Sequence, residues 1–283
     1  KMCGAISHRG PDDEGHYFDS DVMLGMRRLK VIDLNTGNQP IFNESKDIAV
    51  IYNGEIYNYQ ENREYLEAKG HKFYTHSDTE TIVHLYEEFG DKCVEKLRGM
   101  FAFALWDSVK KRLVLARDRI GIKPLYYSET PFGLLFASET RSILASGLIS
   151  QQLEDQAIVR FLQYGSIPSP LTAFKHIRSL PAGHYLMRDE SGISIYRYWD
   201  LAESLGIRDN QTVDLVGLRK RFLESIEQHL TSDVPVGILL SGGMDSSSLV
   251  ALARQASRRD IHTLTIIFGE DQYDESSFAR NVA

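Results

Sequence analysis

The sequence predicts an α+β sandwich of antiparallel sheets and helices, followed by the start of an α/β domain of the Rossmann type. Three observations predict this fold class. Short apolar segments separated by turn residues dominate as far as Tyr198. From Leu215 onward the apolar spacing becomes helical. A strand, a glycine-rich loop, a helix and a second strand then follow, which is typical of a βαβ unit with a parallel sheet covered on both faces.

The first region contains four strong strand patterns and one strong helix pattern. Neighbouring strands are predicted to form antiparallel hairpins. A helix is predicted over residues 78–89, with Ser77 and Glu80 as a capping box at its start, and a second helix over residues 91–97. The predicted strands are residues 48–52, 100–106, 112–116 and 134–137.

The second region begins with a helix and continues with two apolar runs. The runs at residues 234–240 and 262–268 are predicted strands, and residues 274–283 are the start of a helix. This change of pattern predicts domains at residues 1–200 and 206–283, with a boundary around residues 201–210. The apolar stripe of the first helix consists of Leu215, Leu218, Phe222, Ile226 and Leu230.

Composition narrows the function classes. A net charge of −7 argues against nucleic acid and anionic membrane surfaces as partners, which leaves small molecules. The only cysteines, Cys3 and Cys93, form no Cys/His cluster, which argues against a disulfide framework and a structural zinc site. No apolar stretch is long enough to span a bilayer, so the expected location is the cytoplasm. The chain begins with Lys1 and ends in a barely started helix, so we expect it to be cut at both ends.

A glycine-rich loop follows the first apolar run of the second region. Ser241, Gly242 and Gly243 begin the segment SGGMDSS, where a strand passes into a helix. Glycines let the backbone approach a ligand, and the N–H groups at a helix start favour phosphate. No lysine follows, so this is not a Walker loop. The alternative interpretation is a turn in which Asp or Ser caps the helix.

This segment resembles the pyrophosphate loop of the ATP pyrophosphatase family, which cleaves ATP between the α and β phosphates. The resemblance implies ATP and Mg²⁺ as ligands, with the metal at Asp245 and the adenosine between Leu240 and Ile266. The implied ATP-binding residues are Leu240, Ser241, Gly242, Gly243, Asp245, Ser246 and Ile266.

Six motifs in the first region carry a second resemblance: HRGPDDEG at 8–15, RRLKVIDL at 27–34, YNGEIYNY at 52–59, SDTE at 77–80, GMFAFALWD at 99–107 and ARDRIGIKPLYY at 116–127. Together they resemble the glutaminase domain of asparagine synthetases, a class II glutamine amidotransferase. The match extends over essentially the whole chain. It implies a sandwich of the N-terminal nucleophile hydrolase type, followed by a Rossmann-like ATP pyrophosphatase domain.

The same resemblance assigns roles around a bound glutamine. Arg28 would pair with the α-carboxylate, for which a planar guanidinium is suited, and Asp78 would receive the α-ammonium. Asn53, through its side-chain amide, and Gly54, through its backbone N–H, would form the oxyanion hole, with Glu55 helping to hold the substrate. The backbone of four further residues would line the pocket: Leu29, Lys30, Val31 and Ile32.

Each of these residues also has a simpler interpretation. Arg27 and Arg28 could be a solvated basic pair, and Asp78 could cap a helix. An Asn-Gly pair after an apolar strand is ordinarily the strongest short signal for a hairpin turn. On Asn53 and Gly54 alone, the hairpin would be the preferred interpretation.

The nucleophile of this family is a cysteine at the first position of the mature chain. Met2, Cys3 and Gly4 imitate such a start, but Cys3 lies too close to His8 to leave room for the strand that the family has there. We therefore interpret Cys3 as an ordinary cysteine of the helix that leads into HRGPD. The nucleophile and its strand would lie upstream of Lys1, which would leave a sheet edge unpaired.

The resemblance implies a glutamine-dependent asparagine synthetase. Glutamine hydrolysis would supply ammonia to an aspartyl-adenylate made from ATP, giving asparagine, glutamate, AMP and pyrophosphate. This piece alone is expected to be inactive, and a homodimer stays open. Two alternatives stay open as well: a β-lactam-synthetase-like or other relative with a different acceptor, and a non-catalytic remnant that binds ATP or glutamine.

Overall fold

The computed structural model describes residues 1–205, 214–257 and 260–283. The chain forms two compact units, Lys1–Gly206 and Ile207–Ala283. The predicted boundary around residues 201–210 falls partly on residues 206–213, which lie outside the described residues. Within the described residues, no helix is both long and apolar enough to cross a membrane.

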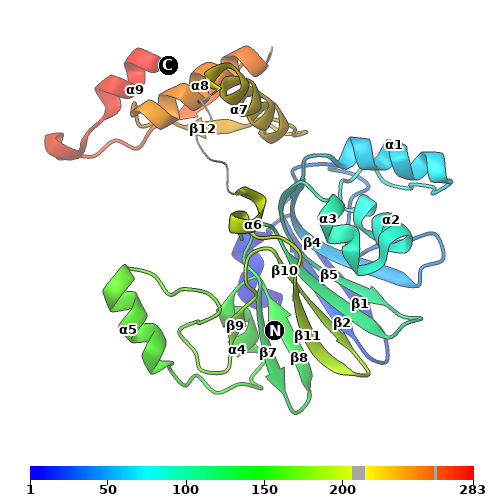
Figure 1. Ribbon diagram of the computed structural model, residues 1–283. Coiled ribbons are helices and arrows are strands. Elements are labelled where there is room, and N and C mark those ends of the chain that lie inside the picture. Colours follow the sequence, from blue (N-terminus) through cyan, green and yellow to red (C-terminus); the bar gives the residue numbers. More distant parts are fainter. Residues whose placement is uncertain (206–213, 258–259) are drawn as a thin grey trace. The chain divides into compact units, whose positions relative to one another are not determined.

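The first unit is built on a six-stranded antiparallel sheet of order β11-β10-β6-β5-β4-β3 (Figure 1). Three predicted strands fall in β4, β5 and β6. Strand β4 is longer than predicted because its pairing with β5 continues from Ile48 opposite Asp107 to Ile56 opposite Gly99. The strands are β3 (Ile41–Phe42), β4 (Ile48–Ile56), β5 (Gly99–Asp107), β6 (Arg112–Arg117), β10 (His184–Asp189) and β11 (Gly192–Arg197).

Three helices cover one face of this sheet (Figure 1). Val50 and Tyr52 of β4 point toward the helices and pack with Leu66, Ile82 and other buried side chains into one core cluster. These helices are α1 (Tyr59–Lys69), α2 (Glu80–Phe89) and α3 (Cys93–Lys96), with a short 3₁₀ turn, η2 (Gly90–Lys92), between the last two. The helix predicted over 78–89 is therefore confirmed from Glu80 onward. The helix predicted over 91–97 is confirmed only over Cys93–Lys96, after the 3₁₀ turn η2, and Leu97 is already extended.

The predicted capping box at the start of α2 is wrong. Its first helical residue is Glu80, and the capping position is Thr79. The Glu80 carboxylate accepts the backbone N–H groups of Tyr74 at 2.8 Å and Thr75 at 2.7 Å. Residues 71–77 belong to no strand, so their N–H groups need side-chain acceptors, and Glu80 supplies one instead of reaching back to Ser77.

Two smaller sheets pack on the opposite face. Ala49 and Ile51 of β4 point to this side and join a second core cluster with Leu24, Trp106 and Leu125. The central sheet and these two smaller sheets together form the sandwich. One sheet pairs β1 (Asp13–Phe18) with β2 (Met23–Arg28), and the other has the order β8-β7-β9, with β7 (Tyr126–Thr130), β8 (Gly133–Ala137) and β9 (Arg178–Ser179). The remaining elements are η1 (Gly4–Arg9), α4 (Thr140–Ala145), α5 (Asp155–Tyr164) and α6 (Leu201–Leu205).

The second unit contains the predicted βαβ arrangement. Strands β12 (Gly237–Leu239) and β13 (His262–Leu264) are parallel, and α8 (Met244–Ala256) connects them. The unit also contains α7 (Leu215–His229), η3 (Asp271–Tyr273) and α9 (Ser276–Val282).

Burial in this unit is incomplete. Leu239 is 72% exposed and Leu264 is 56% exposed, so the expectation of a sheet covered on both faces is wrong for this unit taken by itself. On the predicted stripe of α7, Ile226 is buried, whereas Leu218 and Phe222 are exposed. Two short strands and the helices beside them bury only one apolar face.

Candidate functional site

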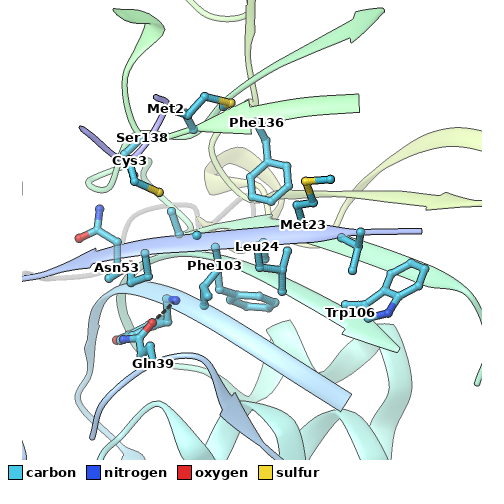
Figure 2. Close-up of a pocket in the computed structure, with 18 of the residues that line it drawn as sticks. Met2, Cys3, Met23, Leu24, Gln39, Asn53, Phe103, Trp106, Phe136 and Ser138 are labelled. Carbon is cyan, nitrogen blue, oxygen red and sulfur yellow. Dashed lines mark hydrogen bonds between the residues drawn. The ribbon is translucent and has the colours of Figure 1, made fainter. Parts of the chain in front are cut away.

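A cavity of about 1340 Å³ in the first unit lies between β2, β8 and the central sheet (Figure 2). It brings together most of the residues predicted to hold glutamine. Lys30 is the exception, because its backbone N–H binds Asp12 at 2.9 Å and its side chain lies 3.8 Å from Asp13. The predicted residues that line the cavity are Arg28, Leu29, Val31, Ile32, Asn53, Gly54, Glu55 and Asp78.

Asn53 and Gly54 lie inside strand β4, so the hairpin-turn interpretation is wrong. Asn53 is opposite Ala102 and Gly54 is opposite Phe101 on β5. A Cβ atom on Gly54 would lie 2.1 Å from the carbonyl oxygen of Met100. Glycine is therefore required here by the close approach of β5, not by a turn.

One edge of β4 turns its N–H groups toward the cavity. Strand β3 pairs only with Ala49 and Val50 of β4. Beyond these residues, side-chain oxygens instead of a neighbouring strand accept the N–H groups of this edge. The N–H of Tyr52 donates to Gln39 Oε1 at 2.6 Å, and the N–H of Ile56 donates to Asp78 Oδ2 at 2.9 Å. Alternate N–H groups of a strand point to the same edge. The N–H of Gly54 therefore lies on this edge between the two.

The side chain of Asn53 supplies a second donor. It projects from β4 on the same face as Ile51, toward the cavity, and Figure 2 shows it near Cys3. Its Nδ2 atom is buried and has no hydrogen-bond partner among the described residues. A buried amide donor without a partner is costly, and it is suited to a ligand that carries an oxygen acceptor. Asn53 and Gly54 thus each present one N–H donor on this part of β4.

Asp78 is almost fully buried where α2 approaches β4. Its Oδ2 atom accepts the Tyr52 hydroxyl at 3.0 Å as well as the N–H of Ile56. Burial raises the pKa of Asp78, and these hydrogen bonds oppose that rise only in part. The carboxylate is held rigidly at the cavity wall, and it does not cap α2, whose capping position is Thr79.

Arg28 is buried, so the solvated-pair interpretation is wrong for this residue. Its guanidinium donates to Asn38 Oδ1 at 2.9 Å and to the carbonyl oxygens of Ile32 at 2.9 Å and Asp33 at 2.7 Å. These bonds hold the segment after β2 against the cavity and leave two of the five N–H donors for a ligand. Burial lowers the pKa of Arg28, and the charges of Asp33, Asp13, Asp78 and Asp12 oppose this only in part. Within the described ranges none of these carboxylates forms an ion pair with it. An anionic group would compensate this buried charge.

Sequence reasoning missed two residues at this site. Lys123 lines the cavity with Glu55, and burial lowers the pKa of its ammonium group. Gln39 anchors the edge of β4 through Tyr52. Lys123 lies within the motif at residues 116–127 and could have been selected from it, whereas no local pattern marks Gln39.

Cys3 also lines the cavity, but it is not activated. It precedes the 3₁₀ helix η1 instead of lying inside a helix as predicted, and its Sγ lies over Gly25 of β2, 2.5 Å from where a Cβ would be. Burial, followed by the charge of Glu14, raises the pKa of the Cys3 thiol. A raised pKa lowers the thiolate fraction, which is opposite to what a nucleophile needs.

The cavity is bordered by two strand edges. In the sheets that the structure describes, β2 and β8 are both edge strands, and every residue of each lines the cavity. Figure 2 shows Met23 and Leu24 of β2 and Phe136 of β8 around the same space. Two facing edges with free backbone groups form a slot that can accept an extended chain.

The glycine-rich loop lies in the second unit, between β12 and α8. Its hydroxyls are drawn together: Ser241 Oγ lies 3.1 Å from Ser246 Oγ and accepts the N–H of Gly243 at 3.3 Å. Ser246 Oγ also donates to the carbonyl oxygen of Gly243. The loop therefore presents the start of α8, where backbone N–H groups are available to an anion.

The other predicted ATP residues lie around this loop in different environments. Asp245 is exposed in the first turn of α8. Ile266 is exposed beyond β13, whereas the Leu240 side chain is buried with Ile238 and Val250. The Leu240 N–H donates to the Leu264 carbonyl oxygen at 2.9 Å and its carbonyl oxygen accepts the Thr265 hydroxyl at 2.8 Å, so only a second hydrogen bond to that carbonyl oxygen is left for a ligand.

Gly242 has a left-handed backbone, with φ of 82°, and a Cβ there would lie 2.6 Å from Phe278 Cβ on α9. We expect Gly242→Ala to destabilise the second unit by about 1–3 kcal/mol in urea unfolding. Gly243→Ala is the matched control, since its φ is −69° and its nearest contact would be Ser241 Oγ at 3.4 Å. Its cost should stay below about 1 kcal/mol. Equal costs for the two variants would contradict the strain argument.

Comparison with known proteins shows the family to which the chain belongs. Residues 1–199 match the glutamine amidotransferase domain family, and residues 217–283 match asparagine synthase. The chain is 41% identical over 278 residues to asparagine synthetase [glutamine-hydrolyzing] 2 of Bacillus subtilis (strain 168), covering 94% of this chain and 37% of the relative. It is 36% identical over 285 residues to asparagine synthetase [glutamine-hydrolyzing] 3 of the same organism, covering 98% of this chain and 46% of the relative.

The chain thus spans less than half the length of these curated relatives. Among solved structures, glutamine phosphoribosylpyrophosphate amidotransferase from B. subtilis superimposes with a TM-score of 0.50 at 18% identity, covering 93% of this chain and 61% of that chain. This likeness shows the fold of an N-terminal nucleophile hydrolase-type amidotransferase. The chain belongs to the glutamine amidotransferase domain family, and its second part, residues 217–283, matches the asparagine synthase family.

Proposed function

We propose that this chain is the glutamine-hydrolysing part, with the first nucleotide-binding elements, of an asparagine synthetase. The observation that carries the proposal is the buried Nδ2 of Asn53, which has no partner among the residues that the structure describes, beside the outward N–H of Gly54. Two fixed donors in a cavity suit the oxygen that becomes negatively charged when an amide carbonyl is attacked.

The cavity also has complementary groups for the rest of glutamine. The Arg28 guanidinium, which has no ion-pair partner in the described part of the chain, would take the α-carboxylate. The buried Asp78 carboxylate would take the α-ammonium, with Glu55 helping to hold the substrate. A free amino acid with a side-chain amide satisfies all of these groups at once.

The nucleophile in this proposal is a cysteine that precedes Lys1. A strand that carries it would pair with β2 and β8 in the slot and bring its first residue to the end near Asn53. The free edges of both strands and the inactive environment of Cys3 support this arrangement.

Replacing Cys3 by alanine is expected to leave glutamine hydrolysis by the complete gene product within about twofold of wild type, because its thiol is not activated. Ammonia release from glutamine measures this. A loss of more than tenfold, with the fold intact by circular dichroism, would make Cys3 the nucleophile after all.

In the second unit, ATP would bind with its phosphates at Ser241, Gly242, Gly243 and Ser246, and with its adenosine beside Ile266. The exposed Asp245 carboxylate in the first turn of α8 fits Mg²⁺, which takes oxygen ligands. When bound, Mg²⁺ would neutralise charge on the phosphates. Ammonia would then convert an adenylated acceptor, aspartate in this proposal, to its amide.

The test is an assay of the complete gene product with glutamine, ATP, Mg²⁺ and aspartate. Asparagine, glutamate, AMP and pyrophosphate in equal amounts are the expected products. Formation of AMP and glutamate only with another carboxylic acid would replace aspartate as the acceptor. Binding of ATP and glutamine without any product would leave a non-catalytic protein, contrary to the proposal.

A further inference from the structure

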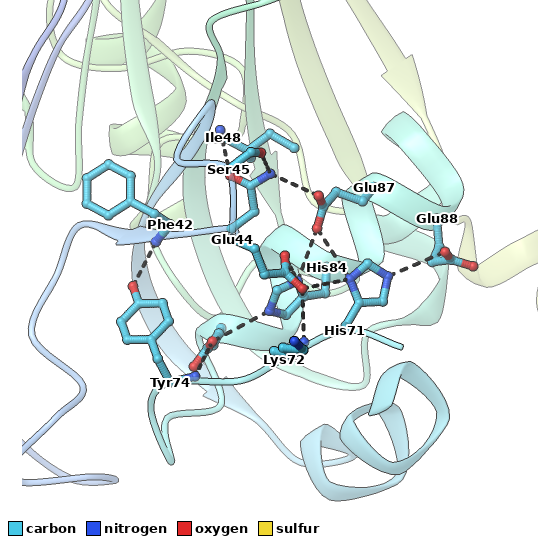
Figure 3. A network of polar contacts seen from close by, with 12 residues as sticks. Phe42, Glu44, Ser45, Ile48, His71, Lys72, Tyr74, His84, Glu87 and Glu88 are labelled. Atoms are coloured by element: carbon cyan, nitrogen blue, oxygen red, sulfur yellow. Dashed lines mark hydrogen bonds and ion pairs between the residues drawn. The ribbon is translucent and has the colours of Figure 1, made fainter. Parts of the chain in front are cut away.

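A cluster of two histidines and two glutamates lies on the helix side of the central sheet (Figure 3). None of the four residues lines the cavity. Glu44 comes from the turn between β3 and β4, His71 from the segment after α1, and His84 and Glu87 from one turn of α2. One ligand atom from each lies within 4.8 Å of all the others.

Four nitrogen–oxygen distances in this cluster are close to the ligand spacing of a tetrahedral metal site, with the two histidines facing different oxygens of Glu44. His71 Nδ1 is 3.5 Å from Glu44 Oε1 and 3.5 Å from Glu87 Oε2. His84 Nδ1 is 3.4 Å from Glu44 Oε2 and 3.0 Å from Glu87 Oε2. Ligand atoms about 2.0–2.1 Å from a tetrahedral zinc ion are about 3.3 Å apart. To bind one ion, the Glu44 carboxylate would have to turn a single oxygen toward the position between the two histidines.

Carboxylates also contact the second ring nitrogen of each histidine, as they do in many metal sites. Each imidazole turns its other nitrogen to a second carboxylate, His84 Nε2 to Glu80 Oε1 at 3.5 Å and His71 Nε2 to Glu88 Oε1 at 3.4 Å. At this distance His84 Nε2 is in ion-pair range of Glu80, but it is buried without a well-formed hydrogen bond. Carboxylates behind histidines fix the ring orientation in zinc sites.

The glutamates are oriented as well. Glu44 Oε1 accepts the backbone N–H of Lys72 at 2.9 Å, and Glu87 Oε1 accepts Asn43 Nδ2 at 2.9 Å (Figure 3). Glu44 Oε2 and Glu87 Oε2 are thereby directed to His84. The site is held from three separate segments of the chain.

The negative charge of this cluster also favours a bound cation. Four carboxylates surround two imidazoles, so even two protonated rings would leave a net charge of −2 in this group. A divalent cation at the four ligands would neutralise part of this negative charge.

We propose that Glu44, His71, His84 and Glu87 form a structural binding site for a zinc-like divalent transition-metal ion. Imidazole ligands select zinc and its neighbours over magnesium. The ion would tie α2 to the β3–β4 turn and to the segment after α1. The lack of a Cys/His cluster argued against a structural zinc site, but that argument does not apply here, because the proposed ligands are two histidines and two glutamates and no cysteine.

The test uses the complete gene product without a histidine tag, stripped with EDTA and titrated with Zn²⁺ alone and with Co²⁺ alone. One equivalent should bind, and Co²⁺ should give the strong visible absorption of a tetrahedral site. At a zinc concentration 100 times the Kd, the Tm should rise by about 5–10 °C. Mg²⁺ should produce neither signal.

Variants separate this site from others. His71→Gln removes a ligand from a partly exposed position and should weaken binding by at least about 100-fold. Glu88→Gln, behind His71, should weaken it by about 10- to 100-fold. His76→Asn, an exposed histidine in the same segment, is the control and should bind like wild type. Binding that is unchanged in folded His71→Gln, or no binding by folded wild type, would overturn the proposal.

Discussion

Asn53→Ala is expected to lower kcat for glutamine hydrolysis by about 100- to 1000-fold, with a smaller change in KM. The Asn53 Nδ2 donor has no partner within the part of the chain that the structure describes, so its removal costs the folded protein little. In the transition state, however, the developing negative charge would lose one of its two donors. Steady-state ammonia release by the complete gene product measures this effect.

Asn62→Ala is the matched control for this result. Asn62 lies on α1, does not line the cavity, and also has a buried Nδ2 without a hydrogen-bond partner among the described residues. Its kcat should stay within about twofold of wild type. If both variants lost activity equally, a general packing defect would explain the effect, and if neither did, Asn53 would not be part of the oxyanion hole.

Arg28→Lys is expected to raise KM for glutamine by about 10- to 100-fold, with little change in kcat when glutamine saturates the enzyme. Lysine retains a charge but cannot both hold the carbonyl oxygens of Ile32 and Asp33 and pair with a carboxylate. The substrate would lose its α-carboxylate contact and part of the pocket wall.

Arg27→Lys controls for loss of the guanidinium on the same strand. Arg27 binds Glu14 at 2.6 Å and the carbonyl oxygen of Gly10 at 3.0 Å. Its variant should leave KM within about threefold of wild type. A KM for Arg28→Lys that equals the KM of this control would show that Arg28 only supports the loop, and the assignment of the α-carboxylate would fail.

Much of the fold follows from local patterns. Short apolar runs bounded by turn residues marked β5 and β6, because a strand covered on both faces is apolar at successive positions. The helical spacing at residues 78–89 marked α2, because burial of one face imposes a period of 3.6 on a helix. The glycine-rich loop was also visible, since Gly242 needs a left-handed backbone that other residues resist.

The motifs identified the family and most of the residues around the cavity, but not their arrangement. Local pattern favoured a hairpin at Asn53 and Gly54, whereas pairing with β5 continues the strand through both residues. Glu80 was expected to cap its own helix, yet the unpaired backbone of Tyr74 and Thr75 binds its carboxylate. In each case a contact from another segment outweighed the local preference.

The sequence by itself determined which elements form and which chemical groups are present, because burial patterns and glycine positions are local properties. Only the tertiary structure decided that Asp78 and Gln39 would occupy the open edge of β4. It also decided that Glu44 and His71 would meet the polar side of α2. These contacts join segments that are far apart in the sequence, so they depend on how the segments pack and cannot be read from the spacing of residues along the chain.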